Sequence, residues 1–131
     1  MNLNTTIPEG VVDIGQYAFV GCYNIDNVII PKSVKNIGRG AFEGCTIKSL
    51  TLLGNPSIED EAFYYCDWLT DIYCYSEEVP SAEDCFFSMN SFTLHVPESA
   101  IEAYKNEYAW SCGFGTIVPI EWTHKHDEPE K

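Results

Sequence analysis

Basic residues are scarce in this sequence. The 131 residues include 7 lysines and arginines against 20 aspartates and glutamates, which gives a formal net charge of −13 at pH 7. A chain with this charge repels the phosphate backbones of DNA and RNA, so nucleic-acid binding is not expected. The sequence also has no continuous apolar run of about 18 residues and no basic amphipathic stretch. Membrane insertion is therefore not expected either.

The short motifs of well-known catalytic and cofactor sites are also missing. There is no glycine-rich phosphate loop, no G-x-S-x-G nucleophile elbow, no C-x-x-C pair and no EF-hand calcium loop. We therefore expect no cofactor, no metal site and no catalytic residues, and the protein is predicted not to be an enzyme. The first residues lack a basic segment followed by an apolar core, so no signal peptide is predicted and an intracellular location stays open.

An internal repeat is the most informative feature that is present. Phenylalanine recurs at a nearly constant interval, at Phe19, Phe42, Phe63 and Phe86. The first three are each preceded by alanine and followed three residues later by cysteine. A unit of about 22 residues cannot bury its apolar side chains alone, but it can when it is stacked on similar units.

Short apolar segments recur between the phenylalanines at the same interval. They are 28–30, 50–52, 72–74 and 94–96. Strands that return once per coil must run parallel, and their alternate residues point to opposite faces of the sheet. Segments at 5–7 and 116–118, which lie one repeat before and one repeat after the series, are expected to extend the sheet at both ends.

Two longer segments carry a family resemblance. They are "IPEGVVDIGQYAFVGC" at 7–22 and "IPKSVKNIGRGAFEGC" at 30–45, and degenerate copies follow at 54–66 and 83–89. With these segments the chain resembles the BspA-like leucine-rich repeat family over residues 7–120. The resemblance implies an α/β right-handed solenoid, with a parallel sheet on the concave face, short helical turns on the convex face and a C-terminal helical cap.

Three regions are expected from this organisation. They are repeat coils over 1–97, a capping helix and last strand over 98–120, and a polar, disordered tail over 121–131. Ile101, Tyr104 and Tyr108 are spaced as one face of an amphipathic helix, and Ser99 is a candidate N-cap for it. Trp110 and Phe114 are expected to help this segment cover the last coil.

Five of the six cysteines follow the repeat. In the fourth repeat Met89 stands in the cysteine position and Cys85 in the alanine position, while Cys74 falls in an apolar strand position. Because methionine cannot form a disulfide or replace a thiolate, the positions call for a small or soft apolar side chain. We therefore interpret the cysteines as free, buried thiols. Disulfides, a zinc site and a catalytic thiol are the less favoured alternatives.

Two polar features have plain explanations. The histidines of "HKH" at 124–126 lie in the polar tail, where a disordered segment is a better interpretation than a weak metal site. The acidic pairs Glu77–Glu78 and Glu83–Asp84 flank a short loop, and we interpret them as solvated side chains rather than as an acid–base pair or calcium ligands.

Outward strand residues are the best candidates for a ligand site. The predicted concave face consists of Asn27, Ile29, Ser49, Thr51, Asp71, Tyr73 and His95. The predicted function is non-enzymatic binding of a protein or a glycan on this face. The family resemblance implies a cell-surface or extracellular location and a role in adhesion. The alternative is a structural or assembly module, part of a larger repeat protein, that self-associates through the apolar edge of its first coil.

Overall fold

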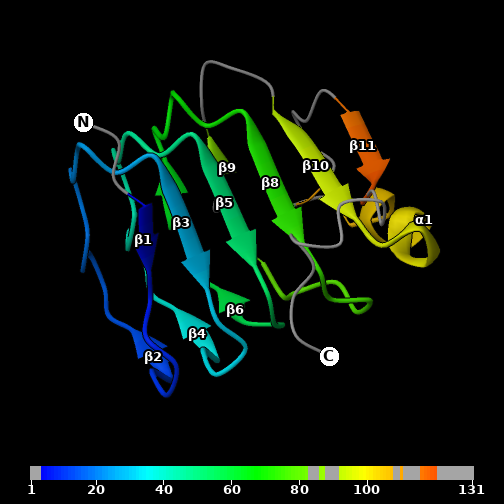
Figure 1. The fold of residues 1–131 in the computed structure, drawn as a ribbon, viewed down its shortest axis with the longest axis horizontal. Helices are drawn as coiled ribbons and strands as arrows, with labels where there is room; N and C mark the ends of the chain where they lie inside the picture. The colour runs from blue at the N-terminus through cyan, green and yellow to red at the C-terminus, as the bar shows by residue number, and fades with distance from the viewer. Residues whose placement is uncertain (1–3, 83–85, 88–91, 108–109, 111–115, 121–131) are drawn as a thin grey trace.

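The chain folds as a solenoid of stacked coils (Figure 1). This computed structural model describes residues 4–82, 86–87, 92–107, 110 and 116–120. One strand of each coil joins a six-stranded sheet in the order β1-β3-β5-β8-β10-β11, in which all neighbours are parallel. The strands are β1 (Asn4–Thr6), β3 (Asn27–Ile30), β5 (Ser49–Leu52), β8 (Asp71–Cys74), β10 (Thr93–Val96) and β11 (Thr116–Pro119). The predicted parallel sheet is confirmed.

Each coil begins at its strand in this sheet. We refer to residues 4–26 as coil 1, 27–48 as coil 2, 49–70 as coil 3 and 71–92 as coil 4. In β3, β5, β8 and β10 exposure alternates between half-buried and buried residues, as the sequence pattern predicts. The inward residues belong to one continuous core that runs through all four coils. The buried side chains of the described residues are all hydrophobic, and the residues that alternate with them along each strand point outward.

The secondary structure on the opposite side of each coil differs from the one that the sequence predicts. The helical turns predicted there are not found among the described residues. That side instead carries β2 (Asp13–Ile14), β4 (Asn36–Ile37) and β6 (Ser57–Ile58), which form a second parallel sheet. A third, two-stranded sheet pairs β7 (Phe63–Tyr64) with β9 (Phe86–Phe87).

Hydrogen bonds between coils explain why no helix forms on that side. The N–H of Phe19 donates to the carbonyl of Ala41 at 2.7 Å, and the N–H of Gly21 donates to the carbonyl of Glu43 at 2.8 Å. These backbone groups are used across the stack, so they are not available for bonds within a helix. Only single turns remain, such as the bond from the Cys22 N–H to the Phe19 carbonyl at 3.1 Å.

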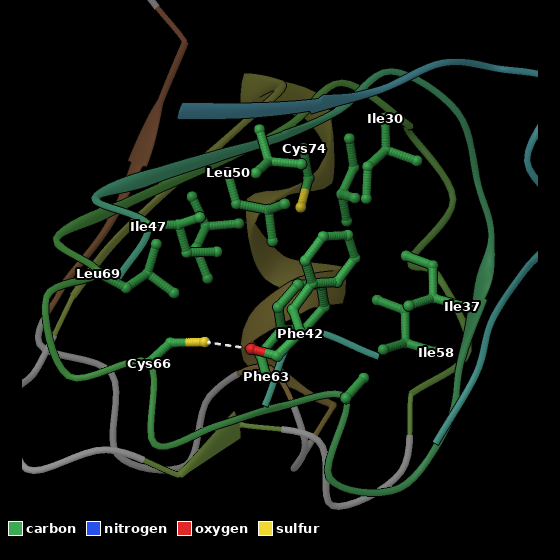
Figure 2. Close-up of a cluster of buried hydrophobic side chains, with 14 of the residues drawn as sticks. Ile30, Ile37, Phe42, Ile47, Leu50, Ile58, Phe63, Cys66, Leu69 and Cys74 are labelled. Carbon is green, nitrogen blue, oxygen red and sulfur yellow. Dashed lines mark hydrogen bonds between the residues drawn. The ribbon is translucent and has the colours of Figure 1, made fainter. Parts of the chain in front are cut away.

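The repeated phenylalanines form a column at the centre of the stack. The rings of Phe19, Phe42, Phe63 and Phe86 stack in succession, with centroids 5.1, 5.3 and 5.4 Å apart. Figure 2 shows Phe42 and Phe63 between the aliphatic residues of the sheet and those of the opposite side. Both rings are 1% exposed, because each has a coil above it and a coil below it.

One short helix packs beside the last strands. A 3-10 turn, η1 (Glu98–Ala100), leads into α1 (Ile101–Lys105), so Ser99 lies within the 3-10 turn and is not the N-cap. Tyr104 and Trp110 are both buried. The Tyr104 hydroxyl donates to the Ser76 carbonyl at 2.9 Å, and the Trp110 indole N–H donates to the Pro80 carbonyl at 2.9 Å. Tyr108 and Phe114, also expected in this region, lie outside the described residues.

The last strand is paired one residue away from the predicted register. The repeat interval of the sequence pairs Leu94 with Thr116, whereas the structure pairs Leu94 with Ile117 and His95 with Val118. A one-residue shift moves every side chain to the opposite face of a strand. The observed register places the larger apolar side chain of Ile117 beside Leu94, on the core side, where Ile117 packs against the core.

Gly38 in coil 2 shows how closely the first two coils are stacked. A Cβ atom at Gly38 would lie 2.8 Å from the Ile14 carbonyl oxygen and 2.8 Å from the Gln16 nitrogen, both backbone atoms of coil 1. At Gly15, the equivalent position in coil 1, a Cβ would meet nothing within 4 Å. We expect Gly38→Ala to lower the free energy of unfolding by about 1–3 kcal/mol, as overpacking does.

The matched control is Gly15→Ala, which should change stability by less than about 0.5 kcal/mol, as unconstrained surface positions do. Urea unfolding followed by circular dichroism measures both. Equal effects of the two substitutions would show that the coils are not stacked this closely at Gly38.

Candidate ligand-binding face

The outward residues of the six-stranded sheet form two straight rows. The first row contains Asn27, Ser49 and Asp71, and the second contains Ile29, Thr51, Tyr73 and His95. All seven are in-register partners across β3, β5, β8 and β10, and all are partly exposed. We call these seven residues the outer sheet face. Every residue predicted for the site lies on it, although its role in binding stays a prediction.

Aromatic stacking orders one end of this face. The rings of Tyr73 and His95 lie parallel, with centroids 4.2 Å apart and an interplanar angle of 13°. They come from neighbouring strands, so the stacking direction runs across the sheet from strand to strand. Each ring therefore presents one of its faces to the other ring.

A polar contact to the same neighbouring strand also holds this histidine. The Nε2 atom of His95 lies 2.8 Å from Oδ1 of Asp71, which is diagonal to it across β8 and β10. The second carboxylate oxygen of Asp71 accepts a hydrogen bond from the Thr70 hydroxyl at 2.9 Å. The carboxylate and both rings are thus held in place before any ligand arrives, which lowers the entropy cost of binding.

The other end of the first row is also ordered by a side-chain contact. The Ser49 hydroxyl donates to the Asn27 side-chain oxygen at 2.5 Å, between adjacent coils. The outer sheet face therefore offers an amide and a hydroxyl at one end, and a carboxylate with two aromatic rings at the other.

Sequence reasoning missed several neighbours of this face. Thr6 pairs with Ile29, Thr93 pairs with Asp71, and Val118 pairs with His95, so all three continue the rows. The repeat interval gives the first two directly, because each lies one repeat away from a predicted site residue. The repeat interval does not identify Val118, because the register of β11 is shifted by one residue.

The cysteine positions are occupied by structural thiols. The four cysteines that the structure describes, Cys22, Cys45, Cys66 and Cys74, form no disulfide, and all but Cys22 are buried. The Cys45 thiol donates to the Phe19 carbonyl at 2.9 Å, and the Cys66 thiol donates to the Phe42 carbonyl at 3.1 Å, as Figure 2 shows for the second. The interpretation as buried thiols outside disulfides is confirmed for Cys45, Cys66 and Cys74, whereas Cys22 forms no disulfide but is only partly buried. Cys85 and Cys112 lie outside the described residues.

Burial strongly perturbs two of these thiols. It raises the pKa of Cys45 to about 11 and that of Cys66 to about 12, against an ordinary value of 9.0. A thiol with a raised pKa is protonated at neutral pH and is a poor nucleophile and a poor metal ligand. The described parts of the chain also hold no cluster of three or more metal-ligating side chains.

No helix within the described residues is long and apolar enough to cross a bilayer.

The architecture defines a class of protein: a leucine-rich repeat solenoid with one strand of each coil in a single parallel sheet. The chain matches the family model described as the BspA type leucine rich repeat region, in six copies over residues 2–112. It therefore belongs to this family. No curated protein and no solved structure matches the chain. Repeat solenoids of this kind present extended surfaces to which other proteins bind.

The raised thiol pKa values predict a loss of stability at alkaline pH. Cys45 and Cys66 bind their protons more tightly in the folded chain than in the unfolded chain, whose thiols ionise near the ordinary value. Their contribution to the free energy of unfolding is therefore complete below about pH 9. It falls as the pH rises toward 11, by at most about 1.4 kcal/mol per pH unit for each thiol.

Urea unfolding at pH 7, 9 and 10 measures this loss. The Cys45→Ala, Cys66→Ala double variant is the control, and its stability should fall less steeply over the same interval. Identical slopes for the two proteins would contradict the assignment to these thiols.

Proposed function

We propose that this chain is a non-enzymatic binding module whose outer sheet face contacts a protein ligand. The observation that carries the proposal is the ordered cluster of Asp71, Tyr73 and His95 at one end of that face. A few anchor residues supply most of the binding energy at protein interfaces, and tyrosine is among the residue types most often found there. The rest of the face supplies the polar groups of Asn27 and Ser49.

Ring orientation favours a protein over a glycan. Sugars bind aromatic residues mainly through the ring face, because the apolar C–H groups of the sugar pack there. In this structure the faces of Tyr73 and His95 are stacked along the sheet, and one face of each is covered by the other ring. The ring edges and the Asp71 carboxylate suit the backbone and side chains of a polypeptide better.

The test compares two double variants that differ in which side of the solenoid they change. Tyr73→Ala with His95→Ala removes the stacked rings, and a protein partner isolated by affinity capture should then bind at least about tenfold more weakly, as hot-spot substitutions do. Gln16→Ala with Arg39→Ala changes exposed residues of coils 1 and 2 that lie away from the outer sheet face, and it should leave the affinity unchanged.

Isothermal titration calorimetry measures the affinities, and circular dichroism checks that both variants keep the fold. Undiminished affinity of the first variant would place the ligand site elsewhere. A partner that proves to be a glycan on an array, with loss of binding in the same variant, would keep the site and replace the ligand class.

Surface display and adhesion form the finer part of this proposal. They rest on membership of the BspA-type family, and the rigid, pre-ordered face is compatible with them. The proposed C-terminal cap rests on Tyr104 and Trp110, which are buried and hydrogen-bonded to the loop at 76–80. In this position they would keep the last coil from exposing its apolar edge.

A structural role in assembly is the second candidate function. Four of the six large hydrophobic residues that are exposed in the described chain belong to coil 1: Val12, Tyr17, Val20 and Tyr23. At the positions of Val12 and Val20, coil 2 carries Lys35 and Glu43. Coil 1 is therefore more apolar than its neighbour at equivalent positions, as an interface with another coil requires.

The test gives coil 1 the residues of coil 2. The Val12→Lys, Val20→Glu variant should remain monomeric in sedimentation velocity at concentrations where the unchanged chain associates. Association of both proteins to the same extent would exclude this surface, and a monomeric unchanged chain would remove the assembly role. Neither outcome affects the ligand face, because these positions lie on other strands and turns.

A further inference from the structure

Two cysteines lie next to each other in the first two coils. The Gly21 N–H donates to the Glu43 carbonyl at 2.8 Å, and the Thr46 N–H donates to the Cys22 carbonyl at 3.2 Å. These bonds bracket the pair Cys22 and Cys45 and hold their backbones at the spacing of neighbouring strands. That spacing, about 4.8 Å, falls within the range of Cα separations found in disulfides, about 4.4–6.8 Å.

The Cys45 side chain is also directed toward coil 1. Its thiol donates to the carbonyl of Phe19 at 2.9 Å, three residues before Cys22. Cys45 is 1% exposed, whereas Cys22 is only partly buried. The pair therefore combines one thiol that a reagent can reach with one that it cannot.

We propose that Cys22 and Cys45 are an oxidisable pair, which a low-molecular-weight disulfide such as oxidised glutathione converts into a disulfide that joins coils 1 and 2. In the first step Cys22 loses its proton to solvent, and its thiolate attacks one sulfur of the reagent, forms a mixed disulfide and releases one thiolate. In the second step Cys45 loses its proton to solvent, attacks the Cys22 sulfur and releases the second thiolate. Two protein thiols are oxidised, and one reagent disulfide is reduced to two thiols.

The next pair in the column does not have this combination. Cys66 follows Cys45 by one coil, but both are buried, and the Cys66 thiol donates to the Phe42 carbonyl. No thiol of that pair is open to the reagent. Burial also raises the pKa of Cys45, so the second step should be the slower one and should follow a detectable mixed disulfide at Cys22.

The disulfide would act on the first coil that the structure describes. Coil 1 is held by its bonds to coil 2 and contains most of the exposed large hydrophobic residues. A covalent bond between the coils restricts the unfolded chain and keeps coil 1 in place. Oxidation would therefore stabilise coil 1 without a change in the outer sheet face.

The experiment uses the full chain and oxidised glutathione. Trypsin cleaves after Lys32 and Arg39, between the two cysteines, and after Lys48 beyond them. The expected product is a linked pair of peptides, 1–32 with 40–48, found by mass spectrometry together with the loss of two free thiols. The oxidised chain should also unfold at a higher temperature than the reduced chain.

Two variants make the result specific. Cys22→Ser should abolish the linked peptides and the thermal shift, and Cys66→Ala should keep both. A glutathione that stays on Cys22, a linkage through any other cysteine, or no reaction would overturn the proposal. If Cys66→Ala does not fold, the peptide map of the unchanged chain decides alone.

Discussion

Contact between successive coils is the interaction on which this structure depends. A single coil of about 22 residues has no interior of its own, so each apolar side chain is buried by the coils before and after it. The phenylalanine column shows this most clearly, because the rings of Phe42 and Phe63 are covered on both faces and Phe19 is covered on one. The backbone follows the same rule, with hydrogen bonds that run between coils on the strand side and on the turn side.

Stacking of the coils requires the same turn in each repeat, and this explains why glycine recurs at fixed positions. Gly21 and Gly44 adopt positive φ at the turn before the cysteine, and Tyr65 has the same conformation in coil 3. A side chain in this region costs about 1–2 kcal/mol, which glycine avoids. The third repeat, where the sequence motif is degenerate, therefore keeps the geometry of the others at an energetic cost. The stack imposes the backbone conformation even where the residue does not favour it.

Periodicity made the larger part of this fold predictable. The repeat interval alone predicts that Ile29, Thr51, Tyr73 and His95 stand in one row, because parallel strands in a solenoid pair at the repeat length. The observed register agrees. The strands of the second sheet were not predicted, since two-residue strands leave no alternation to detect. The contact between Asp71 and His95 was also missed, because it is diagonal across the sheet and depends on the side-chain rotamers. The function could be predicted only as a class, because a repeat specifies a scaffold and not its ligand.

Native-state hydrogen exchange, resolved to single amides, tests the stacking account most directly. If each coil is stabilised by its two neighbours, the amides of β5 and β8 should exchange only through global unfolding, and those of the coil 1 turn at 17–22 should exchange faster through local opening. The difference should persist when the protein concentration is low enough to exclude association. Equal protection of coil 1 and coil 3, or faster exchange in coil 3, would contradict the claim that contact between successive coils holds this structure together.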